Sequence, residues 1–113
     1  MHELSVVFEV IKTVERVVLE NQLSEVETIV LQVGEISTMI PKYLEECFPA
    51  AIDGTRFEKT KLEIEIVTAI GHCRDCGLTF KIVENQGNCP SCIKKNWDLV
   101  SGKEFLIKEI VAY

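Results

Sequence analysis

The sequence predicts an α+β fold in which two helices pack on a small sheet of about three strands, with a cysteine-rich lobe inserted into this body. Three observations support this prediction. Apolar residues recur at helical spacing in two segments, β-branched or alternating residues fill three others, and four cysteines gather between residues 73 and 92. A chain of 113 residues can bury one modest hydrophobic core.

The first helix is predicted over residues 4 to about 20, where apolar side chains return every three or four positions and charged side chains fill the opposite face. The second is predicted to begin at Pro41, since proline is favoured in a first helical turn, and to end before Asp53. Ser37 or Thr38 is expected to cap it. The residues expected to pack inward from this helix are Tyr43, Leu44, Cys47 and Phe48.

The predicted strands cover residues 26–33, 62–66 and 105–111. The first is β-branched and places Ile29 and Leu31 on one face, and the second alternates apolar and acidic residues. The third is an apolar run of strand length. Because it follows the cysteine-rich lobe, we expect it to pair back onto the sheet that the first two strands form.

The lobe carries two Cys-x-x-Cys pairs, Cys73 with Cys76 and Cys89 with Cys92. Each pair can form a tight turn that places two sulfurs about 2.3 Å from one ion, and the loop between the pairs is long enough to bring them opposite each other. The spacing favours structural zinc. Two disulfides, a thioredoxin-like redox pair and iron in the same ligand set remain alternatives.

The domains are therefore predicted to be discontinuous. Residues 71–99 are expected to form a zinc-ribbon domain, while residues 1–70 and 100–113 form the αβ domain around it. Gly71 and Gly102 lie at the two junctions and would permit the lobes to exchange in a homodimer.

The first three residues, Met1, His2 and Glu3, suggest a second metal site of a different kind. Methionine aminopeptidases need a small second residue, so Met1 is expected to keep its free α-amine. This amine, the His2 amide nitrogen and the imidazole Nδ1 could bind one ion in a plane. Such a nitrogen-rich site favours Ni(II) or Cu(II) over zinc. The fourth donor is open between the Glu3 amide, its carboxylate and another group.

Several motifs occur together in a characteristic order: Met-His-Glu-Leu-Ser at residues 1–5, Val-Gly-Glu-Ile-Ser at 33–37 ahead of Pro41, the two cysteine pairs, and Ser-Gly-Lys-Glu-Phe-Leu-Ile-Lys-Glu-Ile at 101–110. In this order they resemble the HypA/HybF family of hydrogenase nickel-incorporation proteins along essentially the whole chain. The resemblance implies a nickel metallochaperone rather than an enzyme, with nickel at Met1, His2 and Glu3. It also implies structural zinc at Cys73, Cys76, Cys89 and Cys92.

The resemblance further implies partners. These are a hydrogenase maturation GTPase, the large subunit of NiFe hydrogenase and, for some members, urease maturation proteins. In some members histidines flank both cysteine pairs and are proposed to enter the zinc site. Here His72 alone adjoins a pair, so we expect no two-histidine switch. His72 itself is open between an ordinary surface residue and an auxiliary group beside the zinc.

Composition excludes several other classes. A formal net charge of −6 argues against binding to nucleic-acid phosphates. The first residues do not form a signal peptide, and no segment approaches the roughly 20 apolar residues of a membrane span, so a cytoplasmic protein is expected.

Two other functions use the same cysteines. A zinc-ribbon adaptor for protein–protein contact would leave the N-terminal motif unused. A rubredoxin-like iron protein is disfavoured because Ile93 stands where a glycine is expected after the second pair. No nucleophile or histidine–carboxylate constellation accompanies an open metal position, which argues against an enzyme.

Overall fold

A computed structural model describes residues 3–113. The chain forms two compact units, each of which contains a sheet of three strands. The first unit, here the body, contains residues up to 32, 39–65 and 105–113, and the second unit, here the ribbon, contains residues 33–38 and 66–104. The assignment of nickel and zinc to separate domains at residues 70 and 100 stays a prediction.

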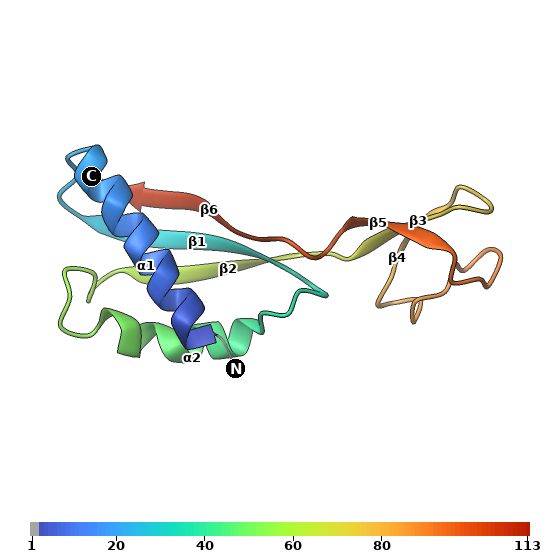
Figure 1. The fold of residues 1–113 in the computed structure, drawn as a ribbon, viewed down its shortest axis with the longest axis horizontal. Coiled ribbons are helices and arrows are strands. Elements are labelled where there is room, and N and C mark those ends of the chain that lie inside the picture. The colour runs from blue at the N-terminus through green and yellow to red at the C-terminus, as the bar shows by residue number, and fades with distance from the viewer. Residues whose placement is uncertain (1–2) are drawn as a thin grey trace. The chain divides into compact units, whose positions relative to one another are not determined.

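In the body, α1 (Glu3–Glu20) matches the first predicted helix. Its apolar stripe is fully buried at Val7, Val14 and Val18, which are at most 1% exposed. Its N-terminal end lies beside α2 (Figure 1). Within residues 3–113, neither helix combines the length and apolar character needed to cross a membrane.

The second helix, α2 (Pro41–Ile52), begins at the predicted proline, but the predicted cap by Ser37 or Thr38 is wrong. The N-cap residue is Ile40, whose hydrocarbon side chain cannot accept a hydrogen bond. Instead, the Ile40 backbone N–H donates to Glu3 Oε2 of α1 at 3.3 Å. The helix start is therefore capped by a residue that is distant in sequence.

Burial on α2 follows a stripe through Leu44, Phe48 and Ala51, which are at most 6% exposed. Leu44 and Phe48 were predicted to pack inward, and this is confirmed. Tyr43 is 46% exposed and Cys47 is only half-buried, so the prediction was wrong for these two. Each precedes a residue of the buried stripe by one position, and one residue corresponds to a rotation of about 100° around the helix.

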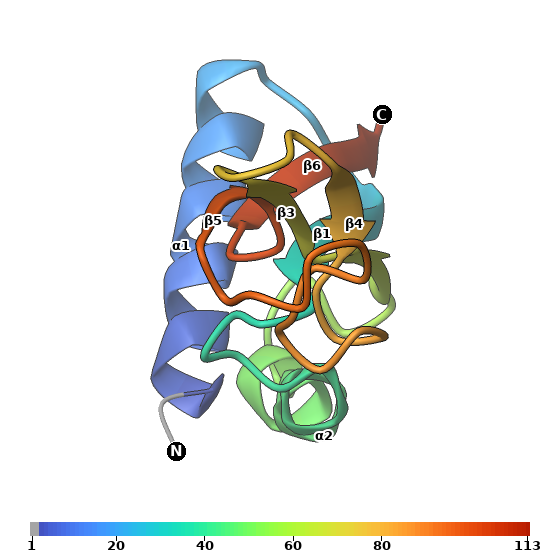
Figure 2. The ribbon, with the colours of Figure 1, turned by 90° about the vertical axis from the view of Figure 1, so that its right-hand side faces the viewer.

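The body sheet is built from β1 (Val26–Gly34), β2 (Lys61–Val67) and β6 (Phe105–Ala112), in the order β2-β1-β6. The last strand therefore pairs with the first, as predicted. Both helices lie on one side of this sheet (Figure 2). Because β1 is central, its Ile29 and Leu31 are almost completely buried.

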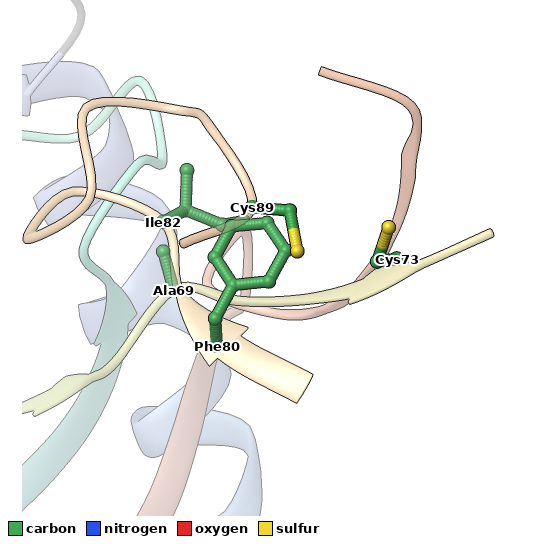
Figure 3. Packing of buried hydrophobic residues seen from close by; sticks show 5 residues of the cluster. All are labelled: Ala69, Cys73, Phe80, Ile82 and Cys89. Carbon is green, nitrogen blue, oxygen red and sulfur yellow. The ribbon is translucent and has the colours of Figure 1, made fainter. Parts of the chain in front are cut away.

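The ribbon sheet contains β3 (Ile70–Cys73), β4 (Thr79–Lys81) and β5 (Trp97–Ser101), with β3 in the middle and both pairings antiparallel. None of these strands was predicted, because they are three to five residues long and show little alternation. A small core stands at their centre. Its buried members are Ala69, Cys73, Phe80, Ile82 and Cys89 (Figure 3).

Candidate metal centre

The first cysteine pair lies in a tight turn at the end of β3. The Gly77 backbone N–H donates to Cys73 O at 3.0 Å, and the Cys73 N–H donates to Leu78 O at 2.8 Å. Gly77 has a φ of 78°, a conformation that glycine adopts without strain. These bonds fold the chain back on itself so that both cysteines of the pair can face one point.

The second pair repeats this geometry residue for residue. Ile93 N–H donates to Cys89 O at 2.8 Å, and Cys89 N–H donates to Lys94 O at 2.9 Å. Ile93 takes the place that Gly77 has in the first turn, with a φ of 63°. The structure thus has two matching turns although only the first has glycine at the left-handed position.

The two turns bring together all four predicted zinc ligands. Their sulfurs lie within 4.8 Å of one another. The Sγ atoms of Cys73 and Cys92 are 3.5 Å apart, and those of Cys76 and Cys89 are 3.6 Å apart. A disulfide would require about 2.05 Å, so the four groups are separate thiols.

The thiols differ in their affinity for protons. Backbone hydrogen bonds from Cys76 and then Asp75 hold the pKa of Cys73 at about 7, although burial opposes this. For Cys92, the backbone hydrogen bond from Lys94 lowers the pKa, but the adjacent Cys73 sulfur and burial outweigh it and raise the pKa to about 11. One thiolate therefore hinders ionisation of its neighbour, and a bound cation would remove that penalty.

Four sulfurs around one point fit a tetrahedral zinc ion and would fill its coordination shell. Such a site has no open position for substrate or water. Zinc would therefore supply folding energy by joining the two turns, and it would not supply catalysis.

The predicted auxiliary residue, His72, lies on β3 just before the first cysteine. It is exposed, and strand pairing places it between Thr79 of β4 and Asp98 of β5. The metal-ligand cluster found among residues 3–113 consists of the four cysteines and does not include it. A role for His72 beside the zinc stays a prediction.

The predicted nickel residues are described only in part, because Met1 and His2 lie outside the described residues. Glu3 is 4% exposed at the start of α1. Its carboxylate accepts the Ile40 N–H at the start of α2, as described above. The side chain of Glu3 thus has a structural contact with a residue distant in sequence, which was not predicted.

An ion pair that no sequence motif predicted lies beside the cysteines. Arg74, which lies between two predicted ligands, donates from Nε to Asp98 Oδ1 at 2.8 Å. This pair raises the pKa of Arg74 and lowers the pKa of Asp98. Both residues are visible in the sequence as charges near the cysteines, but only the pairing of β3 with β5 brings them together.

Comparisons with a family model, with related sequences and with solved structures give consistent results. Residues 1–112 match the family model described as "Hydrogenase/urease nickel incorporation, metallochaperone, hypA". The chain is 32% identical over 110 residues to the hydrogenase maturation factor HypA of Chlorobium limicola, covering 97% of this chain and 95% of that protein. It is 36% identical over 110 residues to the corresponding factor of Chlorobaculum parvum, covering 97% of each.

The fold is similar to the solution structure of the Ni metallochaperone HypA from Helicobacter pylori, with a TM-score of 0.66 and 28% identity over 99% of this chain and 97% of that one. Sequence and fold thus agree along almost the full length, which confirms the resemblance read from the motifs. The family consists of nickel metallochaperones and not of enzymes. The chain belongs to the HypA family of metallochaperones for hydrogenase and urease nickel incorporation.

Proposed function

We propose that this protein binds Ni(II) at its N-terminus and helps to insert it into the large subunit of NiFe hydrogenase. The family match carries this proposal, because it begins at residue 1 and so includes the Met-His-Glu motif. Nickel is the cargo, bound in the αβ domain of residues 1–70 and 100–113. Zinc is the resident ion of residues 71–99, held by the four clustered cysteines.

The proposed nickel donors are nitrogens of Met1 and His2: the α-amine, the His2 amide and the imidazole Nδ1. A planar set of nitrogens suits Ni(II), whereas the four thiolates of the ribbon suit zinc. Since the Glu3 carboxylate already accepts the Ile40 N–H, we favour the Glu3 backbone nitrogen or another group as the fourth donor.

The two sites differ in a way that fits delivery. Zinc with four protein thiolates is closed to exchange partners, so it can maintain the ribbon. A site at a chain end with few protein ligands lets an acceptor replace them one at a time. The nickel site is therefore the one from which an ion can be passed on.

The same proposal defines the partners. Hydrogenase maturation requires contact with the large subunit that receives nickel, and we include a maturation GTPase, urease maturation proteins and a homodimeric state in the proposal. Five unbridged thiols in the described chain suit a reducing compartment, so we place the protein in the cytoplasm.

The decisive experiment is a calorimetric titration of Ni(II) into the untagged, zinc-loaded protein. We expect one nickel per chain, lost in His2→Ala and in a version whose N-terminus is extended so that the α-amine is displaced. The chain contains only one other histidine, and His72→Ala serves as the matched control that should bind nickel normally. Zinc content should be the same in all four proteins.

Unchanged nickel binding in His2→Ala would contradict the proposed site and leave a zinc-ribbon adaptor as the better account. Repeating the titration from pH 5.5 to 8 adds a second test. Protons compete for the α-amine and the imidazole, whose ordinary pKa values are about 8 and 6.5, so nickel affinity should rise with pH. Equal affinity at both ends of this range would exclude these donors.

A further inference from the structure

Side chains from the first cysteine turn reach the segment that leaves the second turn. Arg74 Nε and Nη2 both donate to Asp98 Oδ1, at 2.8 and 2.5 Å, and Nη1 donates to Asn96 Oδ1 at 3.1 Å. Asn96 Nδ2 donates in turn to Asp75 Oδ2 at 3.4 Å. We call these four residues, Arg74, Asp75, Asn96 and Asp98, the Arg74 clasp.

Further hydrogen bonds reinforce the clasp at both ends. The Arg74 N–H donates to Asn96 O at 2.9 Å, and β3–β5 pairing sets Cys73 opposite Trp97. Trp97 Nε1 donates to Gly87 O at 2.9 Å, in the loop that leads into the second turn. Residues 96–98 are therefore bonded to the first turn on one side and to the approach of the second turn on the other. These contacts involve no metal.

We propose that the Arg74 clasp positions the metal centre, so that Arg74 and Asp98 keep the two cysteine turns together and slow the loss of zinc. The proposal rests on the assignment of zinc to the four cysteines and is independent of nickel. Neither residue is a ligand, and both act through the cysteines that they hold in place.

The location of the clasp explains why it would affect release. A chelator must open zinc–sulfur bonds one after another, and the exposed Cys76 is the accessible first step. Opening of the first turn carries Cys76 away from the ion. Arg74 and Asp75 lie between the two ligands of that turn, so opening it strains or breaks their bonds to Asn96 and Asp98.

A single exposed ion pair contributes little to stability, and the side chains of Arg74 and Asp98 are 56% and 58% exposed. The clasp differs from such a pair in two respects. The guanidinium donates three hydrogen bonds in a fixed plane, which a lysine cannot reproduce. In addition, its partners lie on a segment that is already anchored by the backbone.

The test is the rate at which zinc passes from the protein to an excess of the colorimetric chelator 4-(2-pyridylazo)resorcinol. We expect Arg74→Ala and Asp98→Asn to release zinc roughly three- to tenfold faster than the unmodified protein. This change is at or below the smallest loss of metal affinity that is typical when a group orienting a metal ligand is removed. The difference should shrink at about 1 M salt, where the screening length is about 3 Å.

Lys81→Ala is the matched control, because it also removes a cation of the ribbon and leaves Glu84 without its partner at 3.9 Å, but does not touch the clasp. Its release rate should stay within about twofold of the unmodified rate. The exchanged pair Arg74→Asp with Asp98→Arg should recover part of the lost retention. Zinc content and Trp97 emission, measured before the chelator is added, establish that each protein starts folded and loaded.

Unmodified release rates in both single variants would overturn the proposal, and so would equal acceleration in Lys81→Ala, since that would indicate a general effect of charge. If Arg74→Ala holds no zinc, Asp98→Asn and Arg74→Lys give the same comparison with smaller changes. An unmodified protein without bound zinc would instead overturn the zinc assignment itself.

Discussion

At the scale of single residues, Ile93 occupies a backbone position that suits glycine. Its φ of 63° lies in the left-handed region, which costs a residue with a Cβ about 1–2 kcal/mol. The side chain is 72% exposed and therefore contributes little packing. The matching position in the first cysteine turn is Gly77.

We predict that Ile93→Gly stabilises the ribbon by about 0.5–1 kcal/mol, because relief of backbone strain exceeds the greater freedom that glycine gives the unfolded chain. Chemical unfolding of the zinc-loaded protein, followed by Trp97 fluorescence, measures this change. Ile93→Ala is the control, since alanine keeps a Cβ at the same φ and should gain less. A lower stability for Ile93→Gly would show that the exposed side chain makes an important contact.

Glu3 offers a second residue-scale prediction. Its buried carboxylate caps α2 through Ile40 N–H. Glu3→Ala should destabilise the body by about 1–2 kcal/mol, because a helix N-terminus loses its acceptor. Glu3→Gln retains an oxygen acceptor and should lose less. Urea unfolding followed by circular dichroism at 222 nm separates the two, and equal losses would argue against the capping role.

At the scale of elements, the end of β1 passes very close to the segment between β5 and β6. A Cβ placed on Gly34 would lie 2.0 Å from the backbone oxygen of Gly102. Two hydrogen bonds fix this approach within the ribbon: Gly34 N–H to Glu104 O at 2.6 Å, and Ile36 N–H to Gly102 O at 2.9 Å. Neither backbone can move aside without losing these bonds.

We therefore predict that Gly34→Ala destabilises the protein by about 3 kcal/mol or more, the upper range for overpacking. Gly54→Ala is the control, because Gly54 has a φ of 72° but nothing within 4 Å of the added carbon. It should lose only about 1 kcal/mol from backbone strain. Thermal unfolding of both variants, with zinc bound, measures the difference, and similar losses would mean that the close approach can relax.

At the scale of the whole molecule, we expect the two units to depend on metal to different degrees. The ribbon core has five buried residues, and two of them, Cys73 and Cys89, are themselves proposed zinc ligands. So small a core needs a metal to stay folded. Both helices belong to the body, which buries its own apolar stripes from α1, α2 and β1.

Removal of zinc by a strong chelator should therefore unfold the ribbon and leave the helices. We expect Trp97 emission to shift to longer wavelength, because the indole loses its bond to Gly87 and its edge-on contact with Phe80. The 222 nm signal should largely remain. Parallel loss of both signals would show that the body also requires zinc.

Much of this protein can be read from its sequence because the signals are local. Helical periodicity located α1 and α2, alternation located β1 and β2, and the spacing of Cys73, Cys76, Cys89 and Cys92 was enough to predict that their sulfurs converge. The order of the motifs also identified the family, which the comparisons confirmed.

Only the tertiary structure decided the contacts between residues distant in sequence. The cap of α2 comes from Glu3, and the partner of Arg74 is Asp98, 24 positions away. The ribbon strands are too short to show a periodic pattern in the sequence. The register between β3 and β5 brings the residues of the Arg74 clasp together. Local sequence sets backbone preferences over a few residues, whereas such pairings depend on how separate segments pack, which no single segment encodes.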